Sequence, residues 1–136
     1  LFEKDGRRYF RLAENVLISQ EDIRQVQLAK AAIRAGIEIL LTSHNLKPED
    51  LKTVIIAGAF GYHLSEESLF GIGILPALKQ AKFSFVGNSS LEGAVQALLN
   101  KKLVNDASRI ACTVQVMELS QIPDFEGVFV KKMHFL

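Results

Sequence analysis

The sequence predicts a three-layer α/β domain that contains parallel strand pairs. The expected elements follow the order β-β-α-β-α-β-α-(α)-β-α, which places helices between successive strands. The β-branched run Val-Ile-Ile at 54–56 is typical of a strand covered on both faces. This run ends in the small residues Ala-Gly-Ala at 57–59, and α/β proteins bind ligands at such strand ends.

Composition limits the class of protein. The chain has 136 residues, 49% of them hydrophobic and 23% charged, as in one globular domain. A net charge of +1, from 16 basic and 15 acidic residues, gives no electrostatic reason to expect a nucleic-acid partner. The single cysteine, Cys112, excludes an internal disulfide, and we expect it to be buried in a reducing compartment. Without an apolar run of membrane-spanning length or a signal peptide, a cytoplasmic protein with no membrane partner is expected.

The N-terminal part is expected to hold a hairpin and one long helix. An Asp-Gly pair at 5–6, between apolar pairs within 1–12, is a strong hairpin signal, and the following strand is expected to reach about residue 18. Ser19, with acids after it, predicts a capped helix over 20–44 that Asn and Pro end. Its apolar residues at helical spacing predict a buried stripe: Ile23, Val26, Ala29, Ile33, Ile37, Leu40 and Leu41.

The remaining elements are expected to be shorter. They are a turn at Pro48, a strand over 53–57, a helix over 66–71 capped by Ser65, a strand over 83–86, a helix ending near 100, a helical piece over 107–112, a strand over 113–119, and a last helix with Pro123 in its first turn that ends near 133. The start at Leu1, within strand-like sequence, suggests a piece of a longer protein.

Two junctions between a strand and a helix are the candidate ligand-binding positions. The first is Ala-Gly-Ala-Phe-Gly at 57–61, and the second is Gly-Asn-Ser-Ser-Leu-Glu-Gly-Ala at 87–94. In a parallel sheet both lie at the carboxyl edge, where a base or ribose can lie flat against glycine backbone. Asn88 and Ser89 can supply hydrogen bonds. A compact turn before a capped helix explains either junction alone, the second more readily than the first, and it is their pairing that favours a ligand site.

Other candidate residues leave alternatives open. The sequence has no Walker A motif, no dinucleotide Gly-x-Gly-x-x-Gly and no metal-ligand cluster, so no catalytic or metal residue is assigned. Lys30 shares a helical face with Gln27 and Arg34, which is either solvated or in contact with a ligand. His63 follows the glycine loop and is either solvated or near the ligand. Phe60 is either a core residue or a neighbour of an adenine ring.

Four segments resemble the C-terminal part of the reductive activators of corrinoid proteins, which are iron–sulfur proteins often described as ferredoxin-like or metal-binding. They are Asp-Ile-Arg-Gln-Val-Gln-Leu-Ala-Lys-Ala-Ala-Ile at 22–33, the glycine-ended strand at 54–61, Ile-Gly-Ile-Leu-Pro at 72–76, and the second junction at 87–94. The resemblance extends from about residue 18 to the end of the chain. Taken together these segments are fairly specific, although none of them is so alone.

The resemblance implies an actin-like ATPase fold of the acetate and sugar kinase, heat-shock chaperone and actin superfamily, with ATP in a cleft between two RNase H-like lobes. Residues 1–136 would form the C-terminal lobe as a single domain, with a mixed, partly parallel sheet and helices on both faces. The segment 55–61 would match the adenosine motif, and 88–94 would match the second connecting motif. The expected nucleotide contacts are Gly58, Ala59, Phe60, Gly61, Asn88, Ser89 and Lys30.

The resemblance also implies a function for the intact parent protein. ATP or ADP with Mg²⁺ would drive electron transfer from a [2Fe–2S] cluster, held in a missing N-terminal domain, to the cobalt of a corrinoid methyltransferase partner, which returns Co(II) to Co(I). The isolated chain is expected to be inactive, because it contains neither the first-lobe phosphate motifs nor the cluster cysteines. The alternatives are a non-catalytic docking or homodimerisation module with the same fold, and a lobe of a sugar or acyl kinase.

Overall fold

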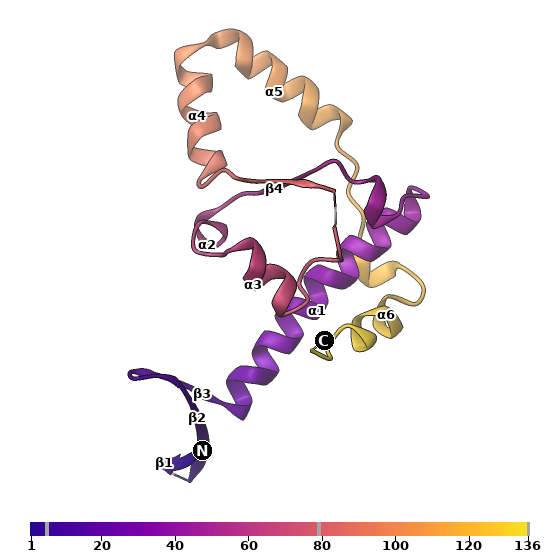
Figure 1. Cartoon of the computed structure of the whole chain (residues 1–136). Helices are drawn as coiled ribbons and strands as arrows, with labels where there is room; N and C mark the ends of the chain where they lie inside the picture. The colour runs from indigo at the N-terminus through magenta and orange to yellow at the C-terminus, as the bar shows by residue number, and fades with distance from the viewer. Residues whose placement is uncertain (5, 79, 136) are drawn as a thin grey trace.

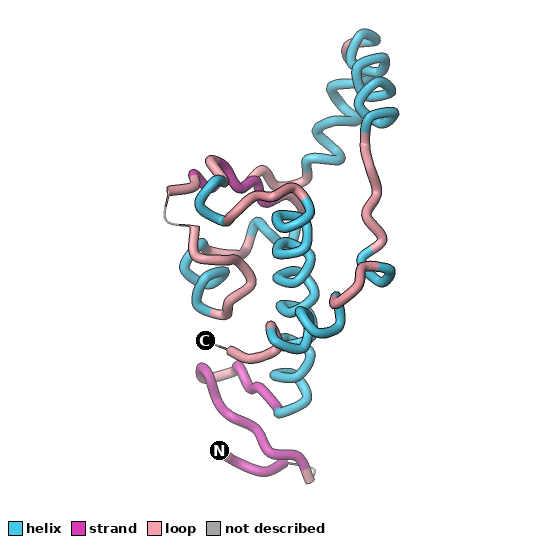
Figure 2. Tube along the Cα trace, turned by 90° about the vertical axis from the view of Figure 1, so that its right-hand side faces the viewer, coloured by secondary structure: helices cyan, strands magenta, loops and turns pink. Residues whose placement is uncertain are grey.

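The chain is elongated around one long helix, α1 (Gln20–Ser43), in a computed structural model that describes residues 1–4, 6–78 and 80–135 (Figure 1). The side chains of residues 4, 60 and 62 also lie outside the described part. An N-terminal hairpin lies at one end of the molecule, and two helices project at the other end (Figure 2). Helix α1 therefore connects the N-terminal hairpin to the rest of the chain.

The N-terminal strands form an antiparallel sheet in the order β1 (Phe2–Lys4), β2 (Arg7–Ala13) and β3 (Val16–Ser19). Gly6 has a φ of +71°, which the predicted hairpin turn requires, while Asp5 lies outside the described residues. The prediction of one strand reaching residue 18 is wrong. The chain reverses at the turn of residues 14 and 15, so that β3 pairs with β2.

Helix α1 begins where the sequence predicts. The Oγ of Ser19 accepts a hydrogen bond from the backbone N–H of Asp22 at 3.1 Å, and the backbone N–H of Ser19 donates to Oδ2 of Asp22 at 2.8 Å. This reciprocal capping box satisfies donors that have no partner within the helix. At the other end Asn45 adopts a φ of +55°, as a residue that ends a helix often does.

The buried face of α1 differs from the predicted stripe. Of the predicted residues only Leu41 is buried, and Ile33 is 46% exposed. The covered face instead carries the small residues Ala31, Ala35 and Gly36. Helix α1 packs with α6 (Phe125–Lys131), and a Cβ on Gly36 would lie 3.3 Å from Cδ1 of Leu119 in the turn before α6, so glycine allows that turn to approach closely. The prediction was wrong because apolar residues occupy more than one face of α1, so spacing alone does not identify the face that packs.

The strands β4 (Thr53–Ile56) and β5 (Lys82–Phe85) pair in parallel and confirm the predicted parallel pair. Among the described residues this pair forms a sheet separate from the N-terminal one. The expectation that 54–56 is covered on both faces is wrong, because Ile55 is 65% exposed. The two projecting helices extend away from this sheet instead of crossing it (Figure 2).

The remaining elements confirm several predictions and correct others. They are η1 (Pro48–Asp50), α2 (Ala59–Tyr62), α3 (Glu66–Gly71), α4 (Ser89–Leu99), α5 (Lys101–Thr113) and η2 (Leu119–Gln121). Ser65 caps α3 as predicted.

Three corrections concern these shorter elements. Helix α5 begins earlier than predicted, because Oδ1 of Asn100 accepts from the backbone N–H of Lys102 at 3.0 Å and so caps a new helix. The predicted strand over 113–119 is not formed, since no neighbouring strand pairs with it in the described chain. Pro123 precedes the N-cap of α6 instead of lying in its first turn. None of the helices in the described ranges is long and apolar enough to cross a membrane.

Candidate functional site

The two glycine junctions meet at the carboxyl edge of the β4–β5 pair. The backbone N–H of Val86 donates to the carbonyl of Ile56 at 3.0 Å, which continues the ladder one step beyond β5. The backbone N–H of Gly58 then donates to the carbonyl of Gly87 at 2.5 Å. The prediction that both junctions lie at one sheet edge is confirmed, because a parallel pair brings its two strand ends to the same side.

Gly58 and Gly87 adopt backbone angles that other residues rarely accept. Their φ angles are +98° and +56°. A Cβ built on either residue would meet no atom within 4 Å, so open space lies above both. Glycine is therefore required here by the turn of the backbone, and it also leaves the main chain accessible to a ligand. The expected nucleotide contacts did not include Gly87, although it is the first residue of the second junction.

Gly61 is glycine for a different reason. It is buried in α2, and a Cβ at this position would lie 2.5 Å from Cγ2 of Ile56. Gly61 therefore lets the short helix α2 pack directly on the end of β4. Ala59 begins α2 at the exposed side of the junction, and the side chain of Phe60 lies outside the described part of the structure.

Asn88 and Ser89 lie directly after Gly87, at the start of α4. Oδ1 of Asn88 accepts from the backbone N–H of Leu91 at 3.1 Å, so Asn88 is the N-cap of this helix. The backbone N–H of Ser89 donates to the carbonyl of Gly87 at 3.0 Å. Both side chains are exposed. The structure thus brings Asn88 and Ser89 together with Gly58, as the sequence predicts, at a helix N-terminus that favours electron-rich ligand atoms.

Lys30 lies elsewhere, against the C-terminal segment 131–135, here called the tail. Its side chain is buried at 3% exposure. Its Nζ donates to the carbonyl of His134 at 2.5 Å and lies 5.2 Å from the ring centre of Phe135. Burial lowers the pKa of Lys30, and the nearby charges of Arg34 and Lys132 lower it further. The contacts of Lys30 are with the tail, and the structure does not bring it together with the glycine junctions.

The chemistry available at this edge is that of binding. Among the residues that the structure describes, no group of His, Cys, Asp and Glu is arranged to hold a metal ion. Cys112 is exposed on α5, which corrects the expectation that it is buried. The groups at the edge include main-chain N–H and C=O groups, the amide of Asn88 and the hydroxyl of Ser89, which can hold and orient a polar ligand.

The parallel pair with its glycine edge places the chain in the α/β class of the prediction, and comparison with known proteins defines the class further. The family described as the C-terminal domain of RACo, the ASKHA domain, matches residues 5–136. The chain belongs to this family. The predicted resemblance and the actin-like ATPase fold class are thereby confirmed.

Individual relatives agree with this family. The chain is 30% identical over 141 residues to the corrinoid activation enzyme RamQ of Eubacterium limosum, covering 98% of this chain and 24% of that protein. It is 30% identical over 100 residues to the [Co(II) methylated amine-specific corrinoid protein] reductase of Methanosarcina barkeri, covering 74% and 18%. A solved structure of a reductive activator for corrinoid, iron–sulfur protein superposes with a TM-score of 0.80 at 40% identity, covering 88% of this chain and 19% of that one.

The chain therefore spans about a quarter or less of the length of these relatives, according to the coverage of 24%, 18% and 19%.

Proposed function

We propose that this chain is the adenine-nucleotide-binding lobe of an ATP-dependent reductive activator, whose parent protein reduces Co(II) to Co(I) in a corrinoid protein. Membership of the ASKHA family and similarity to corrinoid activators and reductases support this proposal. The observation that carries it is the hydrogen bond from Gly58 to Gly87, which joins the two glycine junctions into one edge. That edge has the bare backbone that a flat base or ribose needs.

Different residues of the edge would make different contacts with the nucleoside. The backbone of Gly58 and Gly87 would form the surface against which the ring lies, since a Cβ at either position would fill that space. The amide of Asn88 and the hydroxyl of Ser89 would hydrogen-bond to the ribose. Ala59 and Phe60 would border the ring, and Gly61 would act indirectly by holding α2 on β4. Lys30, buried under the tail, would support the lobe without touching the base.

The cofactors of the proposed reaction divide between this chain and the rest of the parent. A nucleoside fits the open edge, where it would position the phosphates of ATP for hydrolysis. A [2Fe–2S] cluster does not fit, because clusters of this type need several cysteine ligands and the chain has only Cys112. The described residues likewise provide no cluster of carboxylates for Mg²⁺. The redox chemistry would therefore belong to other segments of the parent.

The experiment is an NMR titration of the parent protein with ADP. The backbone amides of Gly58, Gly87 and Ser89 are expected to shift together in a saturable way. Ser89→Ala removes one hydroxyl without removing a described contact, so it should weaken binding several-fold while the fold is kept. Gly71→Ala is the matched control, because its Cβ would meet no atom within 4 Å. Saturable shifts that leave all three amides unmoved would refute the assignment.

The second candidate function, a docking or dimerisation module, is favoured by exposed apolar side chains on the projecting helices. Leu98 is 88% exposed, and Leu91 on the same helix is 61% exposed. Such side chains often mark an interface. Sedimentation measurements and capture of a purified corrinoid protein, each with and without ADP, test it. Binding of the corrinoid protein that does not respond to ADP would favour docking over nucleotide-driven activation.

A further inference from the structure

A cavity of about 360 Å³ lies where the tail packs beside α1 and the loop of residues 73–77. Its wall carries a cluster of cationic side chains, and Figure 1 shows that the chain end lies next to α1. The cationic residues that line the cavity are Lys30, Arg34, Lys131 and Lys132, with His134 beside them. None of these residues belongs to the glycine junctions, so the cavity is a different site from the proposed nucleoside edge.

The positive charge in this cavity is only partly neutralised within the described residues. Glu38 pairs with Lys132, with 2.6 Å between Oε2 and Nζ. Among the residues that the structure describes, no ion pair joins an acid to Lys30, Arg34 or Lys131. The ordinary place for such cations is solvent, where water screens their repulsion. Here they converge on one hollow.

Of the cationic residues in the cavity, Lys30 and Arg34 cost the most free energy to bury. Lys30 is 3% exposed, and its one described hydrogen-bond partner is a neutral carbonyl. Nη1 of Arg34 is buried and has no hydrogen-bond partner among the described residues. Burial lowers the pKa of both side chains, and the charge of Arg34 lowers the pKa of Lys30 further, while the charge of Glu38 partly offsets the effect on the pKa of Arg34. Buried cations and an unpaired donor cost free energy, which an anion between them would recover.

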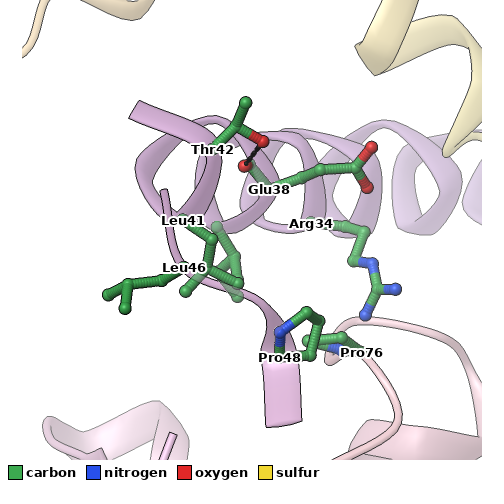
Figure 3. Close-up of a pocket in the computed structure, with 8 residues that line it drawn as sticks. Arg34, Glu38, Leu41, Thr42, Leu46, Pro48 and Pro76 are labelled. Atoms are coloured by element: carbon green, nitrogen blue, oxygen red, sulfur yellow. Dashed lines mark hydrogen bonds between the residues drawn. The ribbon is translucent and has the colours of Figure 1, made fainter. Parts of the chain in front are cut away.

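Arg34 also lines a second, smaller cavity, which Figure 3 shows. Its side chain leaves α1 and reaches toward Pro76, and the carboxylate of Glu38 points in a different direction. Arg34 lines both the small cavity drawn there, with Pro48 and Pro76, and the cationic cavity. Arg34 therefore lies between the small cavity and the cationic cavity and borders both.

We propose that this cavity binds a phosphate group, held by Lys30 and Arg34 from α1 and by Lys131 from the tail. A planar guanidinium binds two phosphate oxygens at once, while an ammonium acts as a point charge with several donors. The cavity also has apolar lining at Leu75, Ala77 and Phe135, so it can accept a small phosphate monoester as well as inorganic phosphate. Because the tail contributes part of the site, the bound anion would fasten the tail to α1.

The experiment is an NMR titration of the chain with inorganic phosphate, at fixed pH and with ionic strength held constant by sodium chloride. Saturable shifts are expected at Lys30, Arg34 and the tail amides. A second titration with glycerol phosphate distinguishes the two sources of the group. Tighter binding of the monoester would identify an organic phosphate, and equal or weaker binding would identify free phosphate.

Variants separate this site from general attraction to a basic chain. Arg34→Gln and Lys30→Met keep most of the side-chain length, and each should weaken phosphate binding by about tenfold or more. Lys102→Met, at an exposed position on α5, is the matched control and should leave affinity unchanged. Circular dichroism checks that each variant is folded. The phosphate proposal would be overturned if the shifts appeared at Ser89 instead of the tail. It would also be overturned if folded Arg34→Gln and Lys30→Met bound phosphate as tightly as the unsubstituted chain. Either result would leave the nucleotide proposal standing.

Discussion

Replacing Gly61 with alanine is expected to destabilise the end of β4. The new Cβ would lie 2.5 Å from Cγ2 of Ile56, whereas carbon atoms in favourable contact lie about 3.5–4.0 Å apart. One of the two groups must therefore move by about 1 Å, and overpacking of this kind costs about 1–3 kcal/mol. Alanine recovers up to about 1 kcal/mol through its helix propensity, so the net loss is expected to be about 0–3 kcal/mol.

A matched substitution isolates the cost of the steric contact. Gly93→Ala, inside α4, adds a Cβ that meets no atom within 4 Å, so it should stabilise the chain by up to about 1 kcal/mol. The difference between Gly61→Ala and Gly93→Ala should then be about 1–3 kcal/mol, the cost of the contact alone. Urea unfolding followed by far-UV circular dichroism measures both free energies of unfolding.

Ile56→Ala completes a double-mutant cycle, because it removes the Cγ2 that the new methyl group would meet. In that background Gly61→Ala should lose its penalty, and the coupling between the two substitutions should be about 1 kcal/mol or more. Equal changes for Gly61→Ala and Gly93→Ala, together with additivity in the cycle, would refute the packing role of Gly61. The glycine would then have to be explained by the ligand.

Three further substitutions test other parts of the structure. Ser19→Ala removes the N-cap of α1 and should cost about 1 kcal/mol, measured by urea unfolding. The pKa of Asp22 is lowered by hydrogen bonds from Ser19, so its contribution to stability is present above the ordinary carboxyl pKa and is lost as the pH falls through the lowered one. Asp22→Asn should flatten that acid limb in thermal unfolding followed against pH, and an unchanged limb would contradict the assignment. Glu38→Gln breaks the half-exposed ion pair with Lys132 and should lower the free energy of unfolding by less than about 1 kcal/mol. It should also increase hydrogen exchange in the tail. Unchanged exchange would show that this ion pair does not hold the tail.

Much of the candidate site could be predicted from the sequence, because its signals are local. A β-branched run that ends in glycine indicates a strand and the conformation of its last residue together, and Gly58 has the positive φ that this implies. The short apolar run at 83–86 that ends at Gly87 predicts a second strand end, and the parallel pairing then brings both to one edge. The cap formed by Asn88 follows from side-chain chemistry within three residues.

Several of the wrong predictions concern contacts between distant segments. The face of α1 that packs depends on α6 and on the turn before it, where Leu119 lies close to Gly36. Nothing in the spacing of apolar residues along α1 identifies that partner. The position of Lys30 under the tail depends in the same way on His134, which lies 104 residues further along the chain.

The hydrogen bond between Gly58 and Gly87 joins main-chain atoms only. Side-chain substitution at neighbouring positions therefore cannot delete it, and proline at position 58 is the one residue whose chemistry removes the donor. The main-chain structure of the edge therefore does not depend on which side chains lie beside it. Related chains could exchange the side chains at 59, 60, 88 and 89 to suit different ligands, while the backbone that positions them stays the same.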